Sequence, residues 1–343
     1  MEAGLAAIRN DAPKAATGSA RNVTDVQPVF GILAVCCYKR GMASLENFRL
    51  VVFRSVATHL SFRKASEELY LTQPAVSSQI KALEEELGVQ LLDRSRGSVS
   101  LTEAGCVLLD YAQRFRALSA EAKARMLEMK GEVGGDLILG ASTTIAQYAL
   151  PRRLGEFRRQ NPRVEIQLTS GNTEEIVTAL LEHRIALGLV EGPPRSRDVH
   201  VEPYLADELL LIVPRGHEWA ERGTIRCKDL PAMSLLMRER GSGTRRVVEL
   251  ALEKRGVHMS DLRIAMELDS TEAIKSAVEA GLGAGFVSRW ALAQDCRNGK
   301  AFQIVAIEGV QIPRSFLLAS VQGQELQGAA AEFRRFLLAD QPA

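Results

Sequence analysis

The sequence predicts an α/β protein with a separate helical segment at its amino-terminal end, and three observations support this fold class. From Leu137 onward, short apolar runs alternate with helical patterns, which is typical of an α/β fold with a mostly parallel sheet. Residues 44–100 instead show helical patterns followed by one short strand-like hairpin. Between these regions, residues 101–130 have the pattern of one long helix.

Length and composition are those of an ordinary globular protein with two or more domains. The chain has 343 residues, of which 46% are hydrophobic and 25% are charged, so more than one core can form. The 43 Lys and Arg residues nearly balance the 42 Asp and Glu residues, which leaves a net charge of +1. This balance excludes nucleic-acid binding through bulk positive charge, but not through a local site.

The sequence predicts no cofactor, metal or membrane partner. The five cysteines are too few and too scattered for a disulfide framework and form no Cys-x-x-Cys pair, and the five histidines lack ligand spacing. A glycine-rich run at 281–285 follows a helix and precedes a strand, the reverse of a dinucleotide-binding loop. No segment reaches the roughly 18 apolar residues of a membrane span. We therefore expect a cytoplasmic protein.

Changes in periodicity divide the chain into four parts, which are an extension at 1–41, a helical domain at 42–100, a linker helix at 101–130 and an α/β domain at 131–343. The extension is expected to form no structural domain. A translation start at Met42 is one explanation for it, and a weak signal peptide with its apolar run at 29–37 is the other. Glycines at 131–136 predict a hinge after the linker helix.

Three consecutive helices are expected in the helical domain, and a very short turn joins the last two. The first opens at Ser44, the second follows an N-cap at Ser61, and the third, at 73–87, follows an N-cap at Thr72. Helices joined by so short a turn cross closely, so their contact needs small residues. Ala65-Ser66 meets this need.

The third helix has two different faces. Its apolar stripe consists of Val76, Ile80, Leu83 and Leu87. The opposite face carries Pro74, Ser78 and Lys81, with Gln73 at its start. Glutamine can pair with adenine in the major groove, and hydroxyl groups reach phosphates or base edges. This face therefore fits duplex DNA, although a helix pair with a polar outer face is also often only a solvated surface.

From Ser44 to Gly105 the chain resembles the winged helix-turn-helix of the LysR-type transcriptional regulators. The matching string is LSFRKASEELYLTQPAVSSQIKALEEELGVQLLDRSRGSVSLTEAG. It departs conservatively at Ala65-Ser66, where the family has two alanines, and at Leu91-Leu92, where the family has Leu-Phe. The resemblance implies binding to double-stranded DNA through Thr72, Gln73, Pro74, Ser77 and Ser78, with backbone contacts from Arg63, Lys81, Arg94 and Arg96.

Apolar side chains in the linker helix recur at spacings of four and three residues, which is typical of a coiled coil. An amphipathic helix packed on its own domain is the alternative. Two DNA half-sites need two recognition helices at a fixed spacing, and the family resemblance implies that such helices pair two chains. We predict a homodimer or homotetramer with dimer contacts from Leu108, Tyr111, Phe115 and Leu118.

From Leu137 to Leu338 the chain is similar, in a weaker motif, to the effector domain of the same family. The resemblance implies two lobes like those of periplasmic binding proteins, with a small ligand between them. Lobe I is expected at 131–205 and 306–343, and lobe II at 206–305.

Ligand-binding residues are expected where strands end and helices begin, because unpaired N–H groups point there. Polar residues occupy several such positions in this part of the sequence. The effector-binding residues predicted on this basis are Ser142, Thr143, Thr144, Ser170, Asn172, Arg238, Ser242, Thr244, Arg245 and Thr271. The glycines, hydroxyls and arginines at 238–245 suit a small anion, although a helix N-cap loop with solvated arginines is the alternative. The string RERGSGTR also resembles LysR-type regulators of carbon dioxide fixation and sulfur assimilation, which implies an oxyanion or a phosphorylated metabolite.

Together these features predict an effector-controlled transcriptional regulator that is not an enzyme, with RNA polymerase as a further expected partner. A solute-binding receptor for a transporter is one alternative, but it needs an export signal and has no use for residues 44–100. A metabolic enzyme with an accessory helical domain is another, and turnover of small anions would reveal it.

Overall fold

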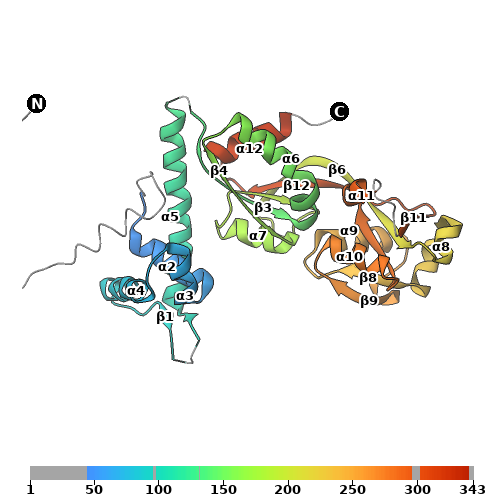
Figure 1. Cartoon of the computed structure of the whole chain (residues 1–343), viewed down its shortest axis with the longest axis horizontal. Coiled ribbons are helices and arrows are strands. Elements are labelled where there is room, and N and C mark those ends of the chain that lie inside the picture. Colours follow the sequence, from blue (N-terminus) through green and yellow to red (C-terminus); the bar gives the residue numbers. More distant parts are fainter. Residues whose placement is uncertain (1–44, 96–97, 131, 296–301, 340–343) are drawn as a thin grey trace, which may run out of the picture.

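The structure is a computed structural model that describes residues 45–95, 98–130, 132–295 and 302–339. A helical domain lies at one end of the long helix α5 (Glu103–Glu128), and an α/β domain lies beside the other end (Figure 1). The expected extension at 1–41 falls outside the described residues. The first helix does not open at Ser44 as expected. It begins at Phe48, because the side chain of Asn47 accepts the N–H of Arg49 and caps the helix there.

The helical domain packs three helices around one core. Its elements are α2 (Phe48–His59), α3 (Phe62–Leu69), α4 (Gln73–Leu87) and a hairpin of β1 (Leu92–Asp93) with β2 (Ser100–Leu101). Fully buried Phe53, Ala65 and Ile80 come from α2, α3 and α4 respectively. Ala65 therefore lies in the contact between the crossing helices, where the sequence predicts a small residue.

Local capping chemistry sets the helix ends in this domain. The side chain of Ser61 accepts the N–H of Lys64, and that of Thr72 accepts the N–H of Ala75, which confirms both predicted N-caps. Gly88 ends α4 with a φ of 69°, in the left-handed region where glycine has no Cβ penalty.

The α/β domain consists of two lobes that share one ten-stranded sheet. Lobe I holds β3 (Gly135–Ser142), η1 (Ile145–Ala149), α6 (Leu150–Gln160), β4 (Val164–Gly171), α7 (Thr173–Leu181), β5 (Leu187–Val190), β12 (Pro313–Val321) and α12 (Gly328–Ala339). Lobe II holds α8 (Glu218–Arg222), β7 (Thr224–Ile225), η2 (Cys227–Ala232), β8 (Ser234–Arg238), α9 (Gly243–Glu253), η3 (Met259–Asp261), β9 (Arg263–Leu268), α10 (Thr271–Glu279), β10 (Ala284–Ser288), α11 (Arg289–Asp295) and β11 (Phe302–Ile307). The long strand β6 (Val199–Pro214) runs through both (Figure 1).

The sheet is mixed rather than mostly parallel. Its order is β4-β3-β5-β12-β6-β10-β8-β9, with β11 and β7 off this path. Strand pairs β3–β4, β3–β5, β8–β9 and β8–β10 are parallel, as the alternation of strands and helices predicts. Strands β6 and β12 are antiparallel to each other and to their other neighbours, because they carry the chain across between lobes in opposite directions.

The chain returns to lobe I at Pro313, later than the expected boundary at 306. Strand β11 pairs with β6 and β7, and Ile307 and Ile312 pack into the core of lobe II. Apolar burial therefore keeps residues 302–312 in lobe II. Lobe I has its own core, where Phe157 and Phe333 meet edge to face at 4.9 Å between ring centroids.

Candidate functional site

The outer side of α4 is polar and open to solvent. Its recognition face, defined as Thr72, Gln73, Pro74, Ser78 and Lys81, is exposed. On the opposite side Val76 and Ile80 are 0% exposed. The predicted division into two faces is thus confirmed for these residues, and Ser77 lies half-buried between them. Leu87 departs from its predicted place in the stripe and is 46% exposed, because α4 ends there, beyond the core.

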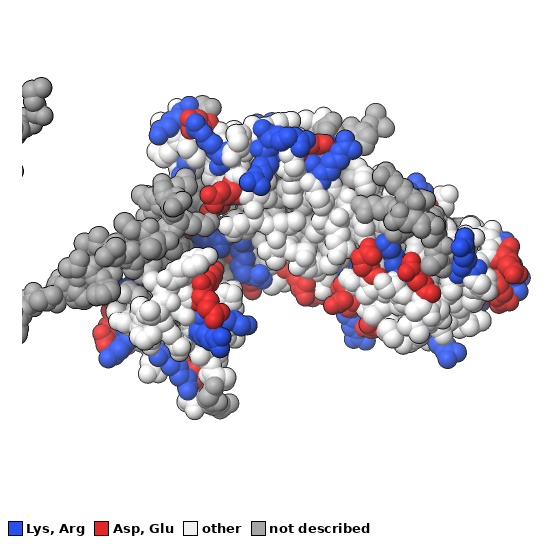
Figure 2. Space-filling model, in the orientation of Figure 1, with Lys and Arg blue, Asp and Glu red and all other residues white. Residues whose placement is uncertain are grey.

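The cations around α4 differ in how strongly they are held. Lys81 lies 3.6 Å from Glu85 and Arg63 lies 3.0 Å from Glu67, in pairs that are mostly exposed. Such pairs contribute little to stability, so phosphate groups can replace the carboxylates. Figure 2 shows cationic and acidic side chains next to each other on the visible face of this domain.

Arg94, predicted to contact the DNA backbone, is attached to its own domain. Its guanidinium lies 4.4 Å from the ring centroid of Phe62 and 3.9 Å from Glu84. Glu84 also accepts the N–H groups of Leu91 and Leu92 at 2.9 and 3.2 Å. These contacts hold the hairpin against α4. Arg96 lies outside the described residues.

Helix α5 exposes a row of large apolar side chains. Tyr111 and Phe115 are each 55% exposed and Leu118 is 61% exposed, and Met126 and Met129 continue the row. Leu108, the fourth predicted dimerisation residue, instead packs against the core of the helical domain. Large apolar side chains in such a row are unfavourable in water, so this side of α5 has the character of an interface.

A buried polar cluster joins the two lobes. We call it the interlobe cluster, and it consists of Thr144, Glu191, Asp207, Thr244, Thr271 and Arg314. Thr144 and Glu191 belong to lobe I, Thr244 and Thr271 begin helices of lobe II, and Asp207 and Arg314 face each other on β6 and β12.

Arg314 is the centre of this cluster. Its Nε donates to Asp207 at 2.6 Å, and its Nη1 donates to Glu191 at 3.0 Å and to Thr244 Oγ1 at 2.8 Å. The side chains of Arg314 and Glu191 are each 2% exposed. Within the described parts of the chain, Nη2 of Arg314 has no hydrogen-bond partner. One edge of a buried guanidinium therefore keeps N–H donors without an acceptor among the described residues.

The two carboxyl groups respond differently to burial. Burial raises the pKa of Asp207 above its ordinary value despite the opposing charge of Arg314. Burial acts in the same direction on Glu191, but Arg314, Thr244, Arg238 and Thr144 together hold the pKa of Glu191 below its ordinary value. Glu191 is therefore a buried carboxylate anion that depends on its donors.

Direct hydrogen bonds close the lobes on each other at this cluster. Thr244 Oγ1 donates to Glu191 Oε2 at 2.6 Å, and the hydroxyls of Thr144 and Thr271 lie 3.0 Å apart. The N–H of Glu174 donates to the carbonyl of Gly241 at 3.3 Å. Together with the bond from Arg314 on β12 to Thr244, these hydrogen bonds cross between lobe I and lobe II, and a ligand held there affects both lobes.

The structure brings together only some of the predicted effector residues. Thr144, Thr244 and Thr271 belong to the interlobe cluster, and Arg238 Nη1 lies 3.5 Å from the Thr271 hydroxyl. Arg238 is nevertheless paired with Glu239. The Ser142 hydroxyl lies 3.3 Å from that of Thr173.

Other predicted effector residues have different surroundings. Arg245 turns away from the cluster to Glu249 and Glu267, at 2.9 and 2.7 Å. Ser170 is exposed on the edge strand β4, and Asn172 caps α7. The hydroxyl oxygens of Thr143 and Ser242 are buried and have no partner among the described residues.

Three of the most buried polar groups were not predicted from the sequence. Glu191 directly follows β5, so the same rule that selected Ser142 and Ser170 would have found it. Asp207 and Arg314 lie inside strands, and only the pairing of β12 with β6 places them opposite each other. No sequence pattern marks that pairing.

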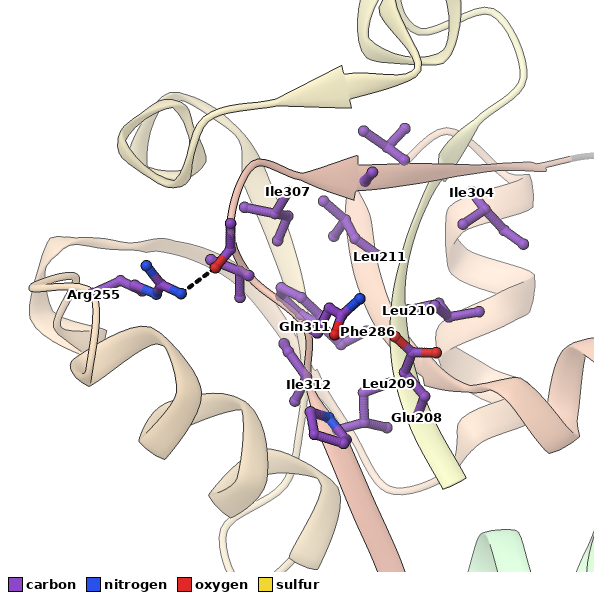
Figure 3. Close-up of a pocket in the computed structure, with 15 residues that line it drawn as sticks. Glu208, Leu209, Leu210, Leu211, Arg255, Phe286, Ile304, Ile307, Gln311 and Ile312 are labelled. Carbon is purple, nitrogen blue, oxygen red and sulfur yellow. Dashed lines mark hydrogen bonds between the residues drawn. The ribbon is translucent and has the colours of Figure 1, made fainter. Parts of the chain in front are cut away.

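A separate hollow of about 730 Å³ lies in lobe II between β6, β11 and the turn that precedes β12 (Figure 3). Its lining is mostly aliphatic, and Arg255 at its rim already donates to the carbonyl of Gly309. Glu208 and Pro313 in this lining are the chain neighbours of Asp207 and Arg314.

Two kinds of feature are absent from the described residues. No group of three or more His, Cys, Asp and Glu side chains there is placed to hold a metal ion. No helix among them is long and apolar enough to cross a membrane.

Comparisons with known proteins match both parts of the chain. Residues 48–106 match the profile described as "Bacterial regulatory helix-turn-helix protein, lysR family", and residues 130–342 match "LysR substrate binding domain". The chain belongs to the LysR family of transcriptional regulators. It is accordingly a LysR-type DNA-binding regulator with an effector-binding domain, in which α3 and α4 form the helix-turn-helix.

Individual relatives of this LysR regulator agree with that assignment. A probable RuBisCO transcriptional regulator of Guillardia theta is 35% identical over 84% of this chain and 94% of its own length. The CcmR regulatory domain of Synechocystis, solved in complex with 2-PG, is 31% identical over 61% of this chain and 99% of that one, with a TM-score of 0.55. Full-length CbnR complexed with its target DNA shares the fold at 24% identity, over 86% and 98% of the two chains, with a TM-score of 0.61.

Proposed function

We propose that this LysR-family regulator binds a small anionic effector between its two lobes, at the interlobe cluster. The observation that carries the proposal is Arg314, a buried guanidinium at the lobe junction whose Nη2 has no partner among the described residues. The buried Ser242 hydroxyl at the start of α9 is a further donor that has no acceptor among the described residues. The relative from Synechocystis, whose solved complex contains 2-PG (2-phosphoglycolate), supports the anionic class.

The effector would act by changing how the lobes pack. Thr144 and Glu191 belong to one lobe and Thr244 and Thr271 to the other, so an anion bound among them has different contacts in closed and open arrangements. A ligand shifts a conformational equilibrium only by its difference in affinity for the two states. The linker helix α5 contacts lobe I through β3 and α12, so it offers a route from the lobes to the DNA-binding domain.

On the DNA side, we propose that Gln73 and Ser78 contact base edges, with Thr72, Pro74 and Ser77 lining the contact, while Arg63, Lys81 and Arg96 contact phosphates. The exposure of the recognition face supports this for the described residues among them. The apolar row on α5 supports pairing of two chains through Tyr111, Phe115 and Leu118. From family membership we also propose the domain boundaries given above, a tetramer and a contact with RNA polymerase.

Because the regulator acts where its DNA lies, we assign it to the cytoplasm. We assign no catalytic activity to it. The relative named as a probable RuBisCO regulator supports genes of carbon dioxide fixation as targets.

Thermal unfolding of the full-length protein tests the proposed effector class. 2-Phosphoglycolate is expected to raise the unfolding temperature, and uncharged glycerol at the same concentration is expected to have no such effect. A ligand at 100 times its dissociation constant stabilises the folded state by about 2.7 kcal/mol, which is readily measured. If none of 2-phosphoglycolate, inorganic phosphate and sulfate raises the unfolding temperature, the result contradicts the proposal of an anionic effector.

A further inference from the structure

We infer that the carboxylate of Glu191 is an internal competitor of the effector, which occupies the donors that an anion entering the interlobe cluster needs. This inference rests on the proposed function, since it concerns the same site. It assigns to Glu191 a role in selecting the effector, by setting the charge that a ligand must carry to displace it.

The donors of Glu191 are those of an anion site. Oε1 accepts the backbone N–H of Thr144 at 2.9 Å, at the start of η1. Oε2 accepts the Thr244 hydroxyl at 2.6 Å and Nη1 of Arg314 at 3.0 Å. A free N–H at a helix start, a hydroxyl and a guanidinium are the groups that bind phosphate and carboxylate ligands in proteins. Here the protein's own side chain fills this set.

The geometry of Arg314 makes such an exchange feasible. Nε is held by Asp207, so Arg314 keeps one ionic partner when Glu191 leaves. Nη1 keeps its bond to Thr244, but the N–H that it donates to Glu191 is then released next to Nη2, which already has no partner in the described residues. Two adjacent N–H donors of one guanidinium form the fork that binds an oxyanion through two oxygens.

The neighbouring arginines Arg238 and Arg245 differ from Arg314 in the origin of their carboxylate partners. Arg238 is held by Glu239 from its own lobe, and Arg245 is held by Glu249 and Glu267, also from its own lobe. Neither contacts a carboxylate across the lobe junction in these pairs. Glu191 instead bridges from lobe I, which also carries Arg314, to the Thr244 hydroxyl of lobe II, so its displacement alters lobe packing.

Charge favours displacement of Glu191 over joint binding. Two carboxylates, Glu191 and Asp207, already surround the single guanidinium of Arg314, and all three side chains are almost fully buried. Adding an anion beside them would place excess negative charge in a region of low dielectric, which is costly. A successful ligand must therefore bind these donors better than a carboxylate does. A doubly charged oxyanion, such as a phosphate monoester, forms stronger charge-assisted hydrogen bonds to these donors than a monocarboxylate does, so the exchange favours it.

Titration calorimetry on full-length protein tests the inference, with 2-phosphoglycolate and glycolate as probes. We compare the wild type with Glu191→Gln, and with Glu279→Gln as a control at the exposed end of α10. Glu191→Gln is expected to bind 2-phosphoglycolate about ten-fold more tightly, a factor that corresponds to about 1.4 kcal/mol. It is also expected to gain measurable glycolate binding. Glu279→Gln should match the wild type.

The outcomes separate this inference from the proposed function. If the wild type binds 2-phosphoglycolate and Glu191→Gln binds it equally or more weakly, Glu191 is not a competitor, while the anion site stands. If neither protein binds any anion, the proposed function itself fails. Glu191→Asp provides a second variant should the amide disturb folding. Its side chain is one methylene shorter and cannot span from Thr144 to Arg314, so tighter binding of 2-phosphoglycolate is again expected.

Discussion

The recognition face of α4 and the interlobe cluster are built in opposite ways. The recognition face comes from one short stretch of chain, and its residues point outward because the helical period places them opposite a buried stripe. The interlobe cluster instead takes residues from positions as far apart as Thr144 and Arg314. Its members are buried and each depends on the others for hydrogen bonds. The contrast shows that a surface site tolerates changes singly, whereas a buried polar cluster responds as a unit.

The largest effect is expected at the centre of the cluster. Arg314→Ala leaves Glu191 and Asp207 buried without their main ionic partner, which destabilises a protein by about 3–5 kcal/mol. Both tryptophans, Trp219 and Trp290, lie in the α/β domain, so urea unfolding followed by fluorescence reports on it. Arg222→Ala, which removes an exposed pair with Glu218, should change stability by less than about 1 kcal/mol. Similar losses in both variants would contradict a special role for the cluster.

The next effect concerns pairing of the DNA-binding domains. Phe115→Glu puts a charge into the exposed apolar row of α5, so the paired form should dissociate and specific DNA binding should fall with it. Light scattering after size-exclusion chromatography measures the mass. Cys106→Glu adds the same charge at an exposed position nine residues away, about half a turn around the helix, and should leave the mass unchanged. A paired Phe115→Glu protein would show that α5 is not the interface.

A smaller effect is expected on the recognition face. Gln73→Ala should weaken binding to the operator by about 1–3 kcal/mol and binding to scrambled DNA much less, because base contacts carry sequence preference. Lys81→Ala should weaken both equally and lower the salt slope by about 1. Fluorescence anisotropy at several salt concentrations distinguishes the two. An equal loss on both DNAs for Gln73→Ala would remove its role in base contacts.

The smallest effect is expected on how the free energy of unfolding changes with pH under acidic conditions. The pKa of Glu191 is held below its ordinary value of 4.5, so its contribution to stability is present above that pH and is lost as pH falls through the folded-state pKa. Asp207 has the opposite sign, because its pKa is raised. Glu191→Gln should therefore lose less stability than the wild type between about pH 5 and pH 3. Parallel curves from urea unfolding would show that Glu191 is not ionised in the closed lobes.

The predictions from sequence were most accurate where chemistry is local. The caps at Ser61 and Thr72 and the end of α4 at Gly88 each depend on residues within one helical turn, and all three are confirmed. Predictions became incomplete where strands from different parts of the chain meet. Arg245 was selected for its charge and position after a strand, yet Glu267 on the neighbouring strand β9 draws it away from the cluster.

The sequence by itself determined the polar and apolar faces of α4, the apolar row on α5 and the alternation of strands and helices, because each follows from periodicity along one segment. Only the tertiary structure decided that β6 and β12 cross between the lobes and that Asp207 and Arg314 are partners. Only the tertiary structure decided that Glu191 reaches donors on both lobes. Hydrogen bonding among buried groups depends on distances between segments, and the order of residues in a chain contains no such distances until the chain folds.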